Sequence, residues 1–392
     1  MKEKLLHTPE GVRDIYGEEY AGKVRLQEKL LHKFHLYGYE DIQTPTFEFF
    51  DIFSSNIGTI PSKELFKFFD KEGNTLVLRP DFTPSIARCV AKYYMDEKMP
   101  VRFCYLGNTF INVSDLQGRL KESTQVGVEL INDNSAYADA EMIALMIESL
   151  QCANLRDFQI TVGNVEFFKG LCEEYGIDPD TEMDLREYIS NKNYFGAESI
   201  LDAARTPSEV KEKILKVTEL FGSIDTVLKA RDFVHNQRSL DALLRLEQIH
   251  EILRSQNMEQ YLTYDVGMLS KYHYYTGVIF RAYTYGSGDA IMKGGRYDNL
   301  LSSFGKDASA IGFAVVLDDL YLSLRRQGLA VETKEPAVLL LYGQSSRQEA
   351  YTTAKELRDQ GVHTVLLQKD DTVAMQVYQD YASSFSYELR EV

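Results

Sequence analysis

The chain has 392 residues, of which 44% are hydrophobic and 26% charged, and its formal net charge is −16. At roughly 150 residues per domain this length predicts two or three domains, and the composition is that of a folded protein. Because affinity for phosphate backbones and anionic membranes comes mainly from Lys and Arg, the acidic balance disfavours both as partners.

The four cysteines are widely scattered and show no metal-ligand spacing. The N-terminal apolar run is too short for a signal peptide, and no apolar stretch approaches the roughly 18 residues of a spanning helix. We therefore expect a cytoplasmic protein with reduced thiols, no metal and no cofactor.

The first third of the chain reads as one helix followed by strands. Apolar spacing predicts a helix over residues 18–37, which Gly38 ends. A second helix is predicted to start with Thr83 as its N-cap and Pro84 in its first turn. The remaining predicted segments are extended chain at 42–50, strands at 75–78, 101–106 and 123–131, and a polar loop at 107–118.

The strand predicted at 123–131 alternates strictly between apolar and polar residues. The apolar face, which we expect to join the core, carries Thr124, Val126, Val128 and Leu130. The other face carries Gln125, Gly127 and Glu129. An amide and a carboxylate flanking a glycine form either a small-ligand face or a solvated sheet surface.

The remainder alternates between helices and strands. Helix is predicted from residue 139 and through most of 171–256, where Thr206 and Glu209 form a capping-box pattern. Strands are predicted at 158–162, 274–283 and 310–317, a tight turn into a helix at 294–298, and a helix from residue 318. After a polar linker at 327–336, the tail reads as strand 337–342, helix 347–360 and strand 362–368.

Single motifs leave the chemistry open. Asp81 and Thr83 could hold an ammonium group or simply start a helix. His273, in an aromatic run at 272–275, could titrate near neutrality or pack as an ordinary residue. The double glycine at 294–295 permits close approach of a ligand but is more often only a turn. The residues alone therefore indicate an antiparallel sheet domain with a possible small-ligand face.

Several segments, in order over about residues 8–322, resemble histidyl-tRNA synthetase. They are 8–14 (TPEGVRD), 38–45 (GYEDIQTP), 78–83 (LRPDFT), 125–129 (QVGVE), 274–275 (YY), 294–298 (GGRYD) and 311–314 (IGFA). The resemblance implies an α+β fold with a class II synthetase-like antiparallel sheet core flanked by helices. It places that core at 1–326, with a helical insertion at about 171–256, and implies a self-dimer through the motif 1 region at 38–45. A small α/β appendage at 336–392 would be a truncated anticodon-binding domain.

The departures from the synthetase pattern concern its phosphate-binding cations. The positions that carry catalytic arginines in that family are occupied here by Ile111, Ser270 and Asp319. Transfer of an adenylyl group needs fixed positive charge, and losing one such donor typically costs roughly 10²–10³ in rate. The tail of about 57 residues has five Lys/Arg against eight Asp/Glu, which is unlike a tRNA-binding surface.

This combination resembles the regulatory subunits of ATP phosphoribosyltransferase, the first enzyme of histidine biosynthesis. The resemblance implies a non-catalytic protein that assembles with the short catalytic subunit as a hetero-octamer. It would be needed for that subunit's activity and for feedback inhibition by L-histidine, and it would bind no tRNA. The implied histidine-binding residues are Asp81, Thr83, Gln125, Glu129, Tyr274 and Tyr275. The alternatives are a divergent amino-acid-activating synthetase paralogue with a non-tRNA acceptor, and a scaffold that binds no histidine.

Overall fold

The structure is a computed structural model that describes residues 6–53, 60–113, 120–269, 274–329 and 337–392. The chain forms two compact units, Met1–Val331 and Glu332–Val392, and each is described by itself. Among the described helices, none combines the length and the apolar character needed to cross a membrane.

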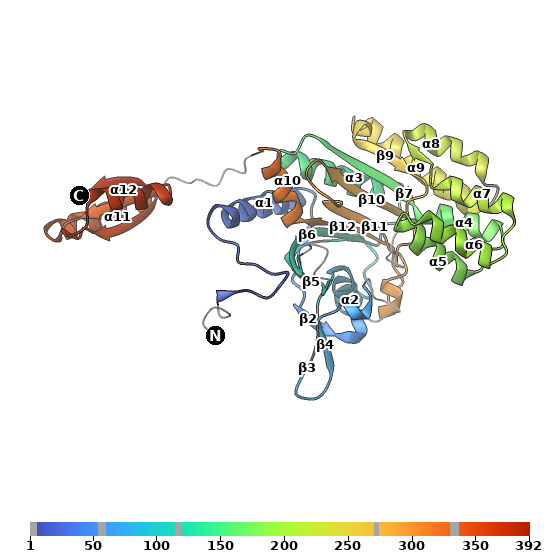
Figure 1. The fold of residues 1–392 in the computed structure, drawn as a ribbon, viewed down its shortest axis with the longest axis horizontal. Coiled ribbons are helices and arrows are strands. Elements are labelled where there is room, and N and C mark those ends of the chain that lie inside the picture. Colours follow the sequence, from blue (N-terminus) through green and yellow to red (C-terminus); the bar gives the residue numbers. More distant parts are fainter. Residues whose placement is uncertain (1–5, 54–59, 114–119, 270–273, 330–336) are drawn as a thin grey trace. The chain divides into compact units, whose positions relative to one another are not determined.

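The first unit is built on a nine-stranded sheet in the order β1-β5-β6-β12-β11-β10-β7-β9-β8 (Figure 1). Most neighbouring strands are antiparallel, and the pairs β1–β5 and β7–β9 are parallel. The strands are β1 (Glu40–Asp41), β5 (Val101–Phe110), β6 (Glu122–Ile131), β7 (Phe158–Asn164), β8 (Phe221–Gly222), β9 (Leu262–Asp265), β10 (Val278–Thr284), β11 (Met292–Arg296) and β12 (Ala310–Val316). This confirms the predicted α+β class with a central, largely antiparallel sheet.

One face of this sheet packs against long helices and forms the main core. The helices there are α1 (Gly17–Leu36), α3 (Ala136–Cys152), α9 (Gln237–Ser255) and α10 (Leu317–Arg326). Leu26, Leu30 and Phe34 of α1 meet the apolar face of β6, where Val126 and Val128 are fully buried. The alternation predicted for 123–131 is therefore correct, because a period of two places every second side chain in this core.

The other elements of the unit lie at the periphery of the large sheet. A small sheet in the order β2-β4-β3 precedes α2, and a set of short helices surrounds α9 (Figure 1). The bounds are β2 (Phe47–Phe49), β3 (Lys67–Phe69), β4 (Thr75–Leu78), α2 (Thr83–Tyr93), α4 (Val165–Glu174), α5 (Pro179–Ser190), α6 (Tyr194–Ala203), α7 (Ser208–Val217) and α8 (Ile224–Ala230).

The second unit is a three-stranded parallel sheet in the order β14-β13-β15 with two helices. Its elements are β13 (Ala337–Tyr342), α11 (Arg347–Asp359), β14 (His363–Gln368), α12 (Met375–Ser384) and β15 (Glu388–Glu391). Val338 and Leu340 of β13 are buried against Ala354 of α11, which makes a small core of its own.

Two predicted loops are strands. The strand predicted to end at residue 106 continues to Phe110, because β6 pairs with it along its full length, from Val101↔Ile131 to Phe110↔Glu122. The tight turn predicted at 294–298 is instead β11, with Gly294 and Gly295 paired to both neighbouring strands. In addition, β10 begins at Val278, four residues later than predicted.

Both predicted N-caps were wrong. Thr83 is the first helical residue of α2, and its hydroxyl donates to the Glu129 carboxylate instead of accepting from the helix backbone. In α7 the cap position is Pro207, with no side-chain cap hydrogen bond. Thr206 instead donates its backbone N–H to Leu201 at the end of α6.

Candidate functional site

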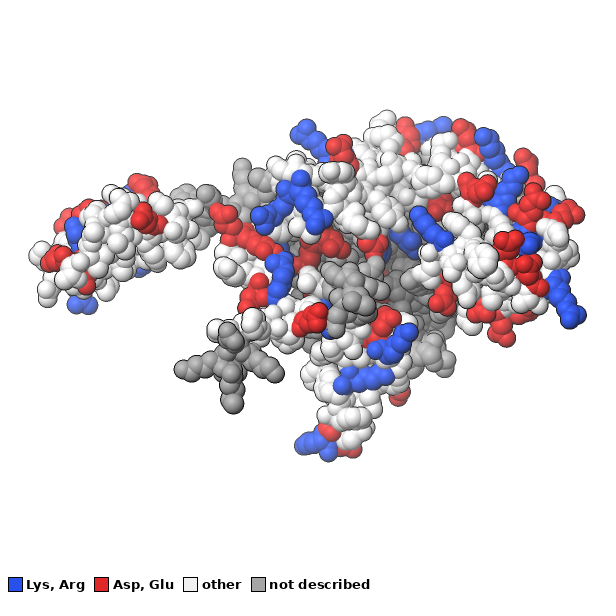
Figure 2. Space-filling model, in the orientation of Figure 1, with Lys and Arg blue, Asp and Glu red and all other residues white. Residues whose placement is uncertain are grey.

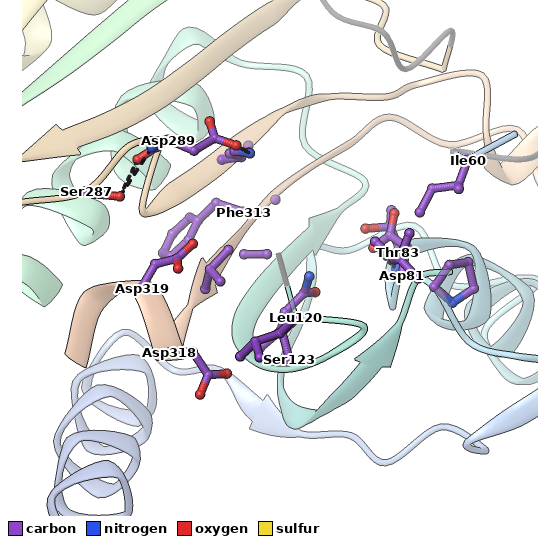
Figure 3. Close-up of a pocket in the computed structure, with 18 of the residues that line it drawn as sticks. Ile60, Asp81, Thr83, Leu120, Ser123, Ser287, Asp289, Phe313, Asp318 and Asp319 are labelled. Carbon is purple, nitrogen blue, oxygen red and sulfur yellow. Dashed lines mark hydrogen bonds and ion pairs between the residues drawn. The ribbon is translucent and has the colours of Figure 1, made fainter. Parts of the chain in front are cut away.

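A cavity of about 890 Å³ lies on the face of the sheet that points away from the main core. Strands β6, β11 and β12 form its floor, the start of α2 forms one wall, and the start of α10 another. Figure 3 shows Asp81 and Thr83 at one side, with Asp289 and Asp319 at the other. All six residues predicted to bind histidine line this cavity: Asp81, Thr83, Gln125, Glu129, Tyr274 and Tyr275.

Glu129 is the buried acid of the cavity, with only 1% of its surface exposed. One carboxylate oxygen accepts a hydrogen bond from the Thr83 hydroxyl at 2.7 Å, and the other accepts from the Tyr297 hydroxyl. Burial raises the pKa of this carboxyl to about 8, the two hydroxyl donors oppose that shift, and the neighbouring Asp81 adds to it. A solvated sheet face, the alternative considered for Glu129, is therefore wrong.

Glycines create the space in which this carboxylate lies. Gly312 is the β12 register partner of Glu129, and Gly295 is the next residue across the sheet. A Cβ added at Gly312 would lie 1.7 Å from Oε2 of Glu129, and one at Gly295 would lie 2.7 Å from the Tyr275 ring. On β6, a Cβ at Gly127 would lie 2.4 Å from the Tyr105 ring. The side chains of Glu129, Tyr275 and Tyr105 therefore fit over the floor because the glycines beneath them carry no side chain.

Gln125 presents an unsatisfied acceptor to the cavity. Its Oε1 atom is buried and has no hydrogen-bond partner among the described residues. Buried polar atoms are nearly always paired, so an orphaned acceptor in a cavity indicates a ligand or water as its partner. An ammonium or N–H donor would satisfy it.

The segment that carries Asp81 and Thr83 is held in place from behind. Arg79 is buried and donates to the carbonyls of Asn108 and Thr44 at 2.8 and 2.9 Å. Its guanidinium also stacks on the Phe82 ring at 4.0 Å. On the cavity side, the Asp81 carboxylate accepts the Thr83 backbone N–H at 3.3 Å.

Tyr274 and Tyr275 lie beside each other, with ring centroids 4.6 Å apart. Tyr274 also meets Tyr297 edge to face at 6.0 Å, so the three rings form one aromatic wall. His273 and Ser270, both singled out in the sequence, lie outside the described residues.

Two of the positions predicted to have lost a cation, Ile111 and Asp319, line the cavity. The described cations that line the cavity are Arg13, which is paired with Glu19, Lys293, which is paired with Asp289 at 2.8 Å, and Arg325, which lies near Glu19. Asp318 is held by Lys23 at 2.6 Å and accepts the Thr124 backbone N–H at 2.8 Å. Two of the three cavity-lining cations are therefore engaged in ion pairs.

Sequence reasoning missed Tyr297 and Tyr105 as site residues. Both are buried, and burial raises the pKa of both phenols, so they stay neutral hydrogen-bonding groups. Tyr297 lay within the run read as a turn at 294–298. Alternation along β11 would have placed it on the same face as Gly295 and so in the cavity.

Comparison with known proteins gives one consistent result. The sequence model described as histidyl-tRNA synthetase matches residues 11–320. ATP phosphoribosyltransferase regulatory subunits from Acetivibrio thermocellus and Ruminiclostridium cellulolyticum are each 39% identical, over 92% and 93% of this chain and 87% of theirs. A crystal structure from Bacillus halodurans, described as an ATP phosphoribosyltransferase regulatory subunit/histidyl-tRNA synthetase, superposes with a TM-score of 0.87 at 31% identity, covering 99% of this chain and 97% of that one.

The chain belongs to the family of ATP phosphoribosyltransferase regulatory subunits. Both resemblances predicted from the sequence are confirmed, together with the class II synthetase-like fold. Because the relatives are named as regulatory subunits, the prediction of a regulatory rather than a catalytic role is confirmed as well. The strands that form the cavity floor lie within the residues that match the histidyl-tRNA synthetase model.

Proposed function

We propose that this regulatory subunit is required for activity of the short catalytic subunit and makes that activity sensitive to L-histidine. The observation that carries the proposal is the buried Glu129, hydrogen-bonded to Thr83 and Tyr297 inside a cavity whose Gln125 acceptor is unsatisfied. Such an arrangement suits a small ligand that carries several N–H donors.

Histidine offers donors at both ends. In our assignment the α-amino group lies near Asp81 and Thr83, and Gln125 orients the amino acid. The imidazole meets Glu129 and Tyr275, with Tyr274 packing alongside. Because the Thr83 hydroxyl donates to Glu129, its oxygen remains available to accept from an ammonium.

The lining of the cavity argues against amino-acid activation. An adenylyl-transfer site stabilises phosphate oxygens with preorganised cations. Here Ile111 is aliphatic and Asp319 is acidic, and of the three lining cations Arg13 and Lys293 are already paired, which leaves Arg325. We therefore favour a histidine sensor over the divergent synthetase paralogue.

The composition of the second unit also favours a histidine sensor, because it is unlike that of a tRNA-binding domain. We interpret 1–326 as the class II synthetase-like core, including the helical insertion at about 171–256, and 336–392 as a shortened counterpart of an anticodon-binding domain. That tail has five Lys/Arg against eight Asp/Glu, and acidic and basic side chains are interspersed over the visible face of the molecule (Figure 2). A tRNA surface would need a basic patch.

Regulation then requires that histidine bind two states of the complex with different affinity. We propose a cytoplasmic hetero-octamer with the short catalytic subunit, in which this chain self-associates through the 38–45 region. Histidine would favour the less active state.

The decisive experiment measures phosphoribosyl-ATP formation by the short catalytic subunit of the same organism. The assay is run with and without this protein, across a histidine titration. We expect activity to rise on addition of this protein and then to fall with histidine. Activity that ignores both additions would refute the proposal.

Two controls separate the alternatives. Calorimetry should give saturable histidine binding that Glu129→Gln weakens, whereas a flat trace would favour a scaffold. ATP–pyrophosphate exchange in the presence of histidine should stay at background. Exchange above background would instead support the synthetase paralogue.

A further inference from the structure

A second group of chemically active side chains lies on the opposite face of the sheet, at its β1 edge. His35 is in the last turn of α1, Asp41 is on β1, and Cys104 is on β5. The chain reverses after α1 through Gly38, whose φ of +79° suits glycine, and β1 then runs beside the helix end. The parallel β1–β5 register pairs Asp41 with Cys104, so their side chains share a face.

The side chains converge on one point. Nε2 of His35 is 3.1 Å from both Asp41 carboxylate oxygens, and Sγ of Cys104 is 3.4 Å from Oδ1 of Asp41. One ligand atom from each residue lies within 4.8 Å of the other two. Zinc bond lengths and a tetrahedral angle require edges of roughly 3.4–3.6 Å between ligand atoms. Two of the three edges, at 3.1 and 3.4 Å, already approach these lengths, and the third lies within 4.8 Å.

We propose that His35, Asp41 and Cys104 form a binding site for a divalent transition-metal cation, with Zn²⁺ the best match. An imidazole, a carboxylate and a thiolate together suit Zn²⁺, whereas Mg²⁺ and Ca²⁺ take oxygen ligands. Cys104 is buried, while the side chains of His35 and Asp41 are 44% and 69% exposed, so the cation has a route in from solvent in the single chain, although Asp41 also belongs to the 38–45 region proposed above for self-association. The fourth position would be open to water or another ligand.

Without a cation the same atoms form ordinary hydrogen bonds, with the thiol donating to Asp41. Burial, helped by Asp41, raises the pKa of the Cys104 thiol to about 12, so the metal would displace a proton from sulfur when it binds. The Asp41 carboxylate, which now accepts that proton's hydrogen bond, would become a ligand. The site is independent of the histidine cavity, which lies on the other face of β5.

The probe is Co²⁺, which occupies zinc sites and gives a thiolate-to-cobalt absorption band. The metal-free full-length protein is titrated with CoCl₂, and bound Co²⁺ is then displaced with ZnCl₂. We expect saturation at about one cation per chain at micromolar concentrations, with a thiolate band, since three-ligand protein sites hold such cations tightly. Zn²⁺ should abolish the band.

Variants assign the ligands. Cys104→Ser should remove the band, and Cys89→Ser, at a half-buried cysteine on α2, should retain it. His35→Ala and Asp41→Asn change exposed side chains and should keep the fold by circular dichroism. Each should weaken Co²⁺ binding by at least roughly tenfold, because even outer-shell partners are worth about 10–100-fold.

Three results would overturn the proposal. One is the absence of a thiolate band up to millimolar Co²⁺, which would leave only a hydrogen-bonded cluster. Another is a band that persists in Cys104→Ser, which would assign binding to a different thiol. The third is unchanged affinity in both His35→Ala and Asp41→Asn, a readout that stands even if the Cys104 variant does not fold.

Discussion

The carboxylate of Glu129 lies directly over the backbone of Gly312, its register partner on β12. A Cβ at position 312 would be 1.7 Å from Oε2 of Glu129 and 2.4 Å from the carbonyl oxygen of Val128. The second contact is with backbone of the adjacent strand, so it cannot be relieved by a side-chain rotation. The position of the Glu129 carboxylate therefore requires a glycine at position 312.

Gly312→Ala should therefore displace Glu129 and strain the β6–β12 pairing. We expect a loss of about 1–3 kcal/mol in the free energy of unfolding, typical of overpacking, and loss of histidine binding. Chemical denaturation and calorimetry measure the two effects. Gly288→Ala is the matched control, since Gly288 also lines the cavity and a Cβ there meets nothing within 4 Å. Equal effects of both substitutions would disprove the steric argument.

The pKa of Glu129 predicts a pH dependence of stability. Because its folded-state pKa is about 8 and its usual value is 4.5, the native protein keeps a proton that the unfolded chain releases. This group's contribution to the free energy of unfolding is complete at low pH and is lost as the pH rises to about 8. Over that window the loss is on the order of a few kcal/mol.

Glu129→Gln should remove this slope. Relative to the wild type, the variant should gain stability as the pH is raised from about 5 to about 8, measured by urea denaturation at each pH. Glu187→Gln, at an exposed position on α5, is the control and should follow the wild-type curve. A stability difference between Glu129→Gln and wild type that is constant with pH would contradict the raised pKa.

Arg296 is the centre of a buried ion network that joins β11 to α3. It is 3% exposed and donates to Asp139 at 2.9 Å and to the Asp133 carbonyl at 3.0 Å. Arg296→Met would leave the fully buried Asp139 with Arg245 as its remaining cation. We expect a loss of about 3 kcal/mol, because Asp139 loses its buried partner and keeps only the more exposed Arg245.

Arg254→Met is the control for that substitution. Arg254 pairs with Glu251 on the surface of α9, where the two side chains are 59% and 57% exposed. Such pairs are worth about 1 kcal/mol or less. Similar denaturation midpoints for the two variants would argue against a special role for the network.

A substitution of Gln125 should show whether this residue contacts the ligand or stabilises the fold. Gln125→Met removes the buried Oε1 acceptor, so stability of the ligand-free protein should stay the same or rise. Histidine affinity should fall by about tenfold, the worth of one hydrogen bond. Gln256→Met, at an exposed residue after α9, should change neither quantity. A destabilised variant with intact affinity would reverse the assignment.

The sequence was most informative where one face of an element is buried. The alternation of residues 123–131 was correct because β6 has core on one side and the cavity on the other. Predictions from local sequence patterns were wrong where tertiary contacts determine the backbone conformation. Gly294 and Gly295 look like a turn, yet they are paired strand residues without side chains because Tyr275 and Phe280 occupy that space. The capping box predicted from Thr206 and Glu209 likewise does not form, because the backbone N–H of Thr206 donates to Leu201 at the end of α6.

The six predicted site residues converge on one cavity, although they were chosen by resemblance rather than from geometry. The second hydrogen-bond partner of the buried carboxylate could not be assigned from the sequence. Tyr297 lies 168 residues from Glu129 along the chain, and only the sheet order brings them together. The His35, Asp41 and Cys104 group shows no ligand spacing in the sequence for the same reason.

The sheet order also has a consequence for synthesis of the protein. Strand β12 sits between β6 and β11, so it joins a half made by residues 40–131 to a half made by residues 158–296. Until residues 310–316 leave the ribosome, β6 and β11 each present an open edge. Unpaired edges template aggregation, and long-range strand pairing is slow. A nascent chain stalled before residue 310 should therefore be a chaperone client, while one that extends past residue 316 can close its sheet.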